Sequence, residues 1–173
     1  RVENIKLNYV GANKDPKMEG EEKQETKFNY YVGGNKNDYK TNLPSYSKVR
    51  YKNIYDGIDL IYSSQTGQLK SEYIVKPHKD AGKIKIEYEG IKKLEINKNG
   101  DLIIKTATGQ LIEKAPYAYQ DINGIRKEIK AEYKLMASPQ TLPDQIGDKL
   151  LLKERGFRRS YTFEIGDYDK NYE

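Results

Sequence analysis

The side chains that most often carry catalysis or bind metals are scarce in this sequence. Its 173 residues include no cysteine and a single histidine, His78. The absence of cysteine excludes disulfides, thiolate nucleophiles and cysteine-ligated metals, and one imidazole excludes every site that needs two. A Ser-His-Asp triad would need a positioned serine, but the sequence contains no Gly-x-Ser-x-Gly motif. His78 follows Pro77 in a predicted turn, where we expect it to be solvated.

Asp59 is the most conspicuous carboxylate, because apolar residues surround it in residues 57–62. Such a group could be an acid with a raised pKa or a metal ligand. The alternative is structural: the carboxylate could accept hydrogen bonds from backbone amides or pair with Arg50 across a sheet. We favour the structural interpretation because no second carboxylate repeats this context at a fixed spacing.

Oxygen-bearing side chains also alternate in residues 97–101, which superficially resemble a calcium-binding loop. The full Asp-x-Asx-x-Asx-Gly pattern with a distal glutamate is missing, and a hairpin turn explains the Asn99-Gly100 pair. Two further aspartate pairs, at 144/148 and 167/169, fit no better. The sequence therefore predicts no catalytic residue, no bound metal and no cofactor, and we do not expect an enzyme.

Tyrosines are the remaining candidates for a binding surface, since seven of the sixteen lie within residues 30–62. Exposed tyrosines beside lysine and asparagine could stack on sugar rings or nucleobases. Strand alternation could instead place pairs such as Tyr51 and Tyr55 on one strand face, at the margin of a core. We expect mainly structural use, and four candidate contacts with a ligand or partner: Tyr30, Tyr39, Tyr46 and Tyr55.

The elements that must position these residues are predicted to be short strands. Apolar and polar residues alternate with a period of two, as in residues 83–89, and β-branched and aromatic side chains dominate such stretches. Turn signals separate them, most clearly at Asn123 and Gly124, a pair that suits a type I′ hairpin. The sequence predicts an all-β fold: a two-sheet, sandwich-like antiparallel architecture of about 10–12 short strands with little helix.

The strands are expected near residues 2–10, 28–32, 46–55, 58–63, 69–76, 82–90, 93–97, 101–106, 109–115, 117–122, 125–135 and 159–166. We expect more than about 35% strand and less than about 12% helix, against a usual strand content of roughly 20–25%. Residues 12–27 and 137–148 are predicted to be surface loops. Residues 142–155 are the best candidate for a helix.

Charge and hydropathy limit the partners. Lysine and arginine total 31 against 26 acidic residues, a net charge of +5, and only six of the basic residues are arginine. Lysine alternates with glutamate along predicted strands, which is typical of the solvent face of a sheet, so nucleic acid is not an expected partner. No apolar run approaches the roughly 20 residues that span a bilayer, so membrane insertion is not expected either.

Several stretches follow one another in a recognisable order along most of the chain: residues 28–33, 39–51, 54–62, 67–77, 84–90, 100–102, 114–124 and 163–169. In this order they resemble the all-β domain that precedes SBBP (β-propeller-type) repeats and immunoglobulin-like modules in large bacterial secreted proteins. The sequence departs from that family in two ways. Residues 136–159 form an insertion, and the family's tryptophan is absent, with Tyr39 or a neighbour in its place.

The resemblance implies a single β-rich domain over residues 1–173, a segment of a longer polypeptide. It implies a non-catalytic structural or adhesive module of an exported protein, at the cell surface or extracellular, whose partners are flanking domains of the same polypeptide or neighbouring subunits. The alternative is a carbohydrate-binding module that uses surface Tyr, Asn and Lys on surface polysaccharide. Because strand edges recruit other strands, we expect residues 1–10 or 159–166 to pair with strands outside this chain.

Overall fold

The computed structural model describes residues 4–65, 67–136 and 157–173, and it is built almost entirely of strands. Strands account for 62% and helix for 4%, so the all-β prediction and the predicted strand and helix contents are confirmed. The helical residues lie in two 3-10 turns, η1 (Lys36–Asp38) and η2 (Ala81–Lys83). No helix in the described ranges is long and apolar enough to cross a membrane.

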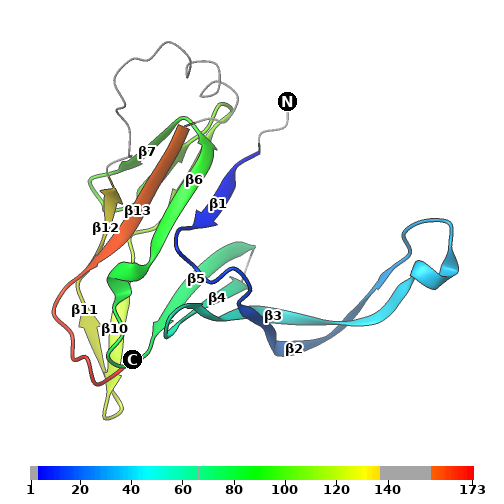
Figure 1. The fold of residues 1–173 in the computed structure, drawn as a ribbon, viewed down its shortest axis with the longest axis horizontal. Helices are drawn as coiled ribbons and strands as arrows, with labels where there is room; N and C mark the ends of the chain where they lie inside the picture. The colour runs from blue at the N-terminus through cyan, green and yellow to red at the C-terminus, as the bar shows by residue number, and fades with distance from the viewer. Residues whose placement is uncertain (1–3, 66, 137–156) are drawn as a thin grey trace. The chain divides into compact units, whose positions relative to one another are not determined.

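The chain divides into two compact units, which we call unit 1 (Arg1–Ala12 and Asp80–Glu173) and unit 2 (Asn13–Lys79). The described residues of unit 1 form three antiparallel sheets (Figure 1). The four-stranded sheet has the spatial order β1 (Lys6–Tyr9), β6 (Lys85–Ile91), β13 (Phe157–Ile165) and β12 (Ala131–Met136). The three-stranded sheet has the order β7 (Lys93–Ile96), β8 (Leu102–Lys105) and β9 (Gln110–Glu113). The two-stranded sheet pairs β10 (Ala118–Ile122) with β11 (Ile125–Ile129).

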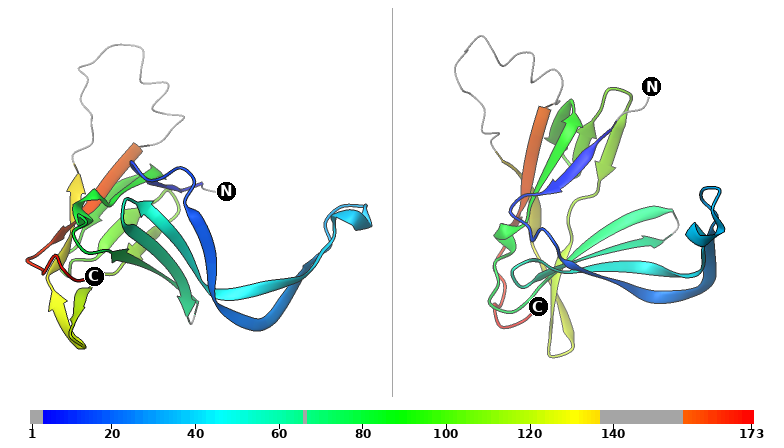
Figure 2. Two further views of the ribbon diagram at one scale, coloured as in Figure 1. Left: turned by 60° about the horizontal axis from the view of Figure 1, so that its bottom comes forward. Right: turned by 45° about the vertical axis from the view of Figure 1, so that its right-hand side comes forward.

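The core of unit 1 lies between the four-stranded and the three-stranded sheet, because β7 packs against β12 and β13 (Figure 2). Alternation explains which side chains enter it. Ile86 and Tyr88 point inward from β6, whereas Lys85 and Glu87, which alternate with them, lie on the other face. Tyr161 lies directly opposite Ile86 on β13 and is also buried. Buried side chains of the three-stranded sheet close this core from the other side: Leu94, Leu102 and Ile104.

The predicted hairpin at Asn123 and Gly124 is confirmed. Both residues have positive φ, 52° and 81°, as a type I′ turn requires, and Ile122 pairs with Ile125 across it. The single strand predicted over 125–135 is wrong, because it breaks at Lys130 into β11 and β12, which belong to different sheets. The Lys130 carbonyl lies opposite Gly166, next to the first residue pair of β12 and β13, and accepts a hydrogen bond from the Gly166 amide at 2.8 Å.

The two chain segments expected to pair with strands outside the chain differ in their hydrogen bonding. The prediction is wrong for residues 159–166, because β13 is hydrogen bonded on both sides, to β6 and to β12. β1 pairs with β6 alone and forms one margin of the four-stranded sheet in the described part of the chain. For residues 1–10, pairing with an external strand stays a prediction.

Unit 2 is one four-stranded antiparallel sheet in the order β2 (Lys17–Tyr30), β3 (Lys40–Tyr55), β4 (Ile58–Gln65) and β5 (Gln68–Val75). Its buried apolar side chains come mainly from β4, where Ile58 and Leu60 are almost completely buried. The surface loop predicted for residues 12–27 is wrong, because residues 17–27 belong to β2. These residues are nearly all polar, so no apolar period marks the strand, and it is held by its backbone pairing with β3 and by ion pairs.

Predictions that concern the later part of the chain lie mostly outside the described residues. The loop at 137–148 and the helix at 142–155 fall there entirely. Of the insertion predicted for 136–159, Met136 ends β12 and residues 157–159 begin β13. The single domain over 1–173 also stays a prediction.

Gly90 should be essential to the pairing of β1 with β6. Its φ is 85°, and a Cβ there would lie 2.5 Å from the Asn4 carbonyl oxygen. Gly90→Ala should therefore lower the free energy of unfolding by about 1–3 kcal/mol, measured by denaturant titration. Gly109→Ala is the control, because Gly109 has open space around its Cα and no positive φ. Equal losses in the two variants would contradict this account.

Candidate functional site

Asp59 acts as a structural acceptor. It lies on β4 and is 4% exposed, and its Oδ1 accepts a hydrogen bond from the Asn53 amide at 2.8 Å. Its Oδ2 accepts one from Arg50 Nη1 at 3.3 Å. Asn53 has a φ of 50° where the β3–β4 register is irregular, so the carboxylate satisfies an amide that the ladder leaves unpaired. Both parts of the structural interpretation, the capped amide and the Arg50 pair, are confirmed.

Asp101 has the same kind of role at the turn between β7 and β8. Asn97 Oδ1 accepts hydrogen bonds from the amides of Asn99 and Asp101, which confirms the hairpin interpretation of residues 97–101. The Asp101 carboxylate accepts from Asn97 Nδ2 and from the Ala115 amide, both at 3.1 Å. The hydrogen bond from Asn97, followed by that from Ala115, lowers the pKa of Asp101. Within the described ranges, no three His, Cys, Asp or Glu side chains lie together in a way that could hold a metal.

A buried tyrosine cluster in unit 1 was not expected from the sequence. Tyr161 packs edge-on against Tyr133, with ring centroids 5.3 Å apart, and stacks on Tyr88 at 6.3 Å. Glu113 of β9 accepts hydrogen bonds from the hydroxyls of both Tyr88 and Tyr161. Burial and, to a lesser degree, Glu113 raise the pKa of Tyr133. The cluster fastens β9 to the four-stranded sheet and leaves Glu113 occupied as an acceptor.

The four tyrosines proposed as contacts have different surroundings. Tyr55 is only 5% exposed, so its assignment to a contact surface is wrong: its ring belongs to the core. Tyr46 is partly exposed and its ring lies over Gly20, where a Cβ would come within 2.5 Å of it. Tyr30 is exposed, and Tyr39 is half-buried. His78 is exposed in a turn, as expected.

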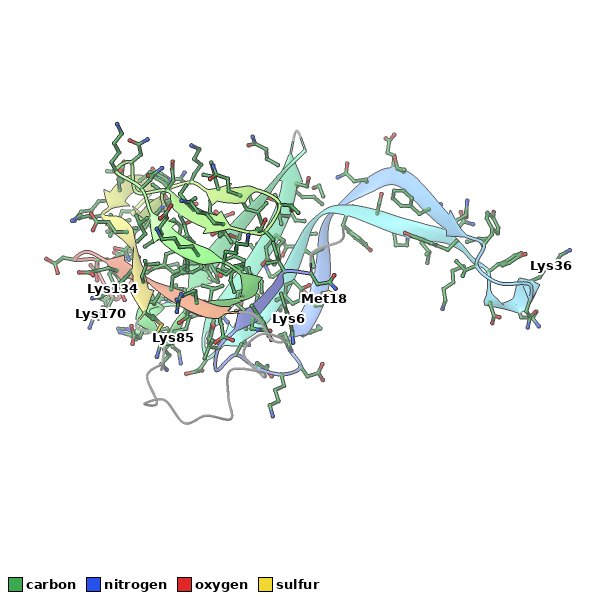
Figure 3. The ribbon with its side chains drawn as sticks, turned by 90° about the horizontal axis from the view of Figure 1, so that it is seen from above. Lys6, Met18, Lys36, Lys85, Lys134 and Lys170 are labelled. Atoms are coloured by element: carbon green, nitrogen blue, oxygen red, sulfur yellow. The ribbon has the colours of Figure 1, made fainter. Side chains whose placement is uncertain are left out.

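Tyr30 and Tyr39 belong to a long two-stranded hairpin that extends beyond the rest of its sheet. β4 pairs with β3 only from Lys48 onward, so β2 is the only strand among the described residues that pairs with residues 40–47. The Ser45 hydroxyl donates to the Thr26 carbonyl across this ribbon. We call residues 26–45 the distal hairpin. Figure 3 shows Lys36 at its far end, with Met18 at the opposite end of β2.

The distal hairpin exposes the densest run of large apolar side chains in unit 2. Phe28, Tyr30, Tyr31 and Val32 are 51–70% exposed. Tyr31 packs edge-on against Tyr39, with ring centroids 5.2 Å apart, which fixes both rings near the turn. Sequence reasoning missed Phe28, Tyr31 and Val32. The available signal was that apolar side chains occupy three consecutive positions, 30 to 32, directly before the glycines at 33 and 34.

Charge is distributed unevenly along β2 and β3. Near the base, Glu19 is paired with Lys17 and Lys52, and Glu22 is paired with Lys48. Hydrogen bonds from Lys17 and then Lys52 lower the pKa of Glu19 to about 2. The distal hairpin instead carries three lysines, at 27, 36 and 40, and one acidic residue, Asp38. The base is electrically compensated, whereas the distal hairpin presents excess positive charge beside aromatic rings.

Replacing Asp59 should affect stability only. Asp59→Asn should lower the free energy of unfolding by roughly 1–3 kcal/mol, because an amide nitrogen replaces one of two occupied acceptors. The control is Asp15→Asn, which makes the same charge change at an exposed position. Denaturant titration of both variants checks the expectation. Retained stability together with loss of a binding activity would refute it and make Asp59 a site.

Asp101 should make the protein sensitive to acid. Its lowered pKa means that the ionised form is favoured in the folded state, so its stabilisation is present above the ordinary value of 3.8 and is lost as pH falls through the lowered value. Asp101→Asn should therefore unfold at a lower temperature at neutral pH and show a shallower decline in acid. Thermal unfolding across this pH range measures both, with Asp167→Asn as the exposed control. Parallel profiles for the wild type and Asp101→Asn would count against it.

Comparison with known proteins gives one result. The model of a family described as a domain of unknown function, DUF7948, matches residues 1–173. No curated protein and no solved structure matches the chain. Since the match spans both units and every strand described above, the chain belongs to the DUF7948 family.

Proposed function

We propose that this protein is a non-catalytic structural and adhesive module of an exported bacterial protein, working at the cell surface or in the extracellular space. Its partners are flanking domains of the same polypeptide or neighbouring subunits. The distal hairpin is the contact element through which the module attaches.

The surroundings of two buried carboxylates and of the half-buried Glu113 support a non-catalytic role. Asp59 and Asp101 both accept hydrogen bonds from backbone amides at irregular points of the strands. Glu113 accepts from two tyrosine hydroxyls. A general acid or base must exchange a proton with a substrate, and these three carboxylates already have structural partners instead.

The observation that carries the proposal is the exposure of the distal hairpin. A two-stranded ribbon by itself is only marginally stable in water. Its apolar side chains remain 51–70% exposed, and a partner that covers them lowers the free energy of the complex. The buried apolar side chains of unit 2 lie at the end of β3 and in β4, near Ile58 and Leu60. The distal hairpin therefore contributes little to the core and is suited to an external contact.

A second candidate, a carbohydrate-binding module, is favoured by the composition of the same segment. Tyr30, Tyr31 and Tyr39 lie beside lysine and asparagine, and exposed aromatic rings of this kind stack on sugars. The two candidates are compatible, since attachment to a surface glycan is one form of adhesion.

The test uses the intact protein in a bacterium that produces it. Labelling of whole cells with a membrane-impermeant biotin reagent should mark the protein. The Tyr31→Ser/Val32→Ser variant should be exported to the same level, yet attachment of the cells to a surface or to one another should fall.

The matched control is Leu69→Ser/Ile125→Ser, which removes two side chains of similar exposure, 73% and 72%, elsewhere on the protein. This control should attach as the wild type does. A protein that stays unlabelled inside intact cells would contradict export. Equal attachment by the Tyr31→Ser/Val32→Ser variant and the wild type would contradict the role of the distal hairpin.

A further inference from the structure

We propose that the distal hairpin binds an anionic polysaccharide, one whose sugars carry carboxylate, sulfate or phosphate groups, by stacking aromatic rings on the sugars and directing lysines at the anions. This inference rests on the adhesive role proposed above and names the ligand class of the same segment.

The lysines of the distal hairpin provide the charge complementarity. Lys27, Lys36 and Lys40 are exposed, and none of them forms an ion pair with another residue that the structure describes. Lysines at the base of the same ribbon do have partners, as Lys48 and Lys52 show. A cation without an intramolecular partner is free to pair with an external anion, and the ribbon concentrates three of them in one segment.

Asparagines add neutral donors to this surface. Asn29 Oδ1 accepts a hydrogen bond from the Asn42 amide at 2.8 Å, and Asn35 Oδ1 accepts one from the Asn37 amide at 3.0 Å. Because the side-chain oxygens are engaged, the amide nitrogens of Asn29 and Asn35 are the groups left for a ligand. These amide nitrogens add neutral donors to the positive charge of the three lysines, and both suit carboxylate, sulfate or phosphate oxygens.

The aromatic rings provide the stacking surface. Tyr30 and Tyr31 are 56% and 63% exposed, and the edge-on contact with Tyr39 holds the Tyr31 ring in place. A ring that is already fixed loses little conformational freedom on binding, so more of the stacking energy appears as affinity. The C–H faces of pyranose rings are apolar and fit such aromatic faces.

Other occupants fit these features less well. A second copy of the chain would bring three further lysines against the first three, and like charges repel. An added strand would meet interrupted edges, because the β2–β3 register shifts twice, Asn42 has a φ of 59° and Pro44 has no amide hydrogen to donate. Single-stranded nucleic acid would share the stacking, but the distal hairpin contains no arginine.

The experiment measures binding of the purified 173-residue chain to immobilised alginate, a polyuronate, and to neutral dextran. Alginate should bind, dextran should bind much more weakly, and affinity for alginate should fall as salt is added. Lys27→Gln/Lys36→Gln/Lys40→Gln should weaken binding about tenfold, the equivalent of three exposed ion pairs. Tyr31→Ser should weaken it about fivefold while leaving the salt dependence unchanged.

The matched control for charge is Lys98→Gln/Lys127→Gln/Lys170→Gln, which removes three exposed lysines elsewhere and should bind alginate as the wild type does. Equal losses in both triple variants would overturn the proposal, because net charge alone would then explain binding. Equal affinity for dextran and alginate would overturn it as well. So would preference for anionic lipid vesicles or for single-stranded DNA over alginate, which would assign the hairpin to a membrane or to nucleic acid.

Failure of this inference can be told apart from failure of the proposed function. If Tyr31→Ser/Val32→Ser abolishes attachment of cells but the purified wild type does not bind alginate, the adhesive role stands and the glycan assignment is overturned. If the protein binds alginate through the distal hairpin but stays inside intact cells, the glycan assignment stands and export is contradicted.

Discussion

The insertion of β13 between β6 and β12 is the constraint on which unit 1 depends. β13 is the last strand of the chain, yet it is hydrogen bonded on both sides and places Tyr161 in the aromatic cluster. The Thr162 hydroxyl also donates to the Ile84 carbonyl at 2.6 Å, which ties η2 to the sheet. Until β13 is in place, β6 and β12 have no common neighbour, and the face that covers the three-stranded sheet is incomplete. Such long-range pairings form late and slowly because the entropy of closing the intervening chain opposes them.

Buried polar groups in both units serve the same purpose, which is to satisfy backbone that leaves the regular ladders. Asp59 does so at the irregular part of β3, and Asp101 at the β7–β8 turn. Gln120 extends the pattern to the end of the chain: it accepts from the Asp169 amide and donates to the carbonyls of Asp169 and Tyr172. These contacts join the residues after β13 to β10. Asp59, Asp101 and Gln120 therefore have structural roles in their respective units.

The sequence was most informative where a local rule decides the structure. The Asn123-Gly124 turn and the alternation in β6 follow from backbone conformation and from the period of a strand, so both could be predicted. The Asp59–Arg50 pair could also be anticipated, because a carboxylate among apolar residues needs a partner. By contrast, β2 is nearly all polar, and only its pairing with β3 reveals it. The burial of Tyr55 and the central place of β13 depend on distant residues, so no short window of sequence contains them. The distal hairpin was predicted only in part. Its tyrosines were recognised as candidates, but its length could not be predicted because the sequence predicts a loop for most of β2.

The order of strands in unit 1 has a mechanical consequence. β1 and β13 both run antiparallel to β6, so they are parallel to each other, and the chain enters β1 near Glu89 and leaves β13 near Lys85, at the opposite end of β6. Tension applied along the polypeptide therefore loads the hydrogen bonds beside β6 together, in shear, instead of opening them one at a time. Unit 2 is inserted between β1 and β6, two strands that are bonded to each other. While these bonds hold, the force passes directly from β1 to β6, so unit 2 and its distal hairpin carry no tension.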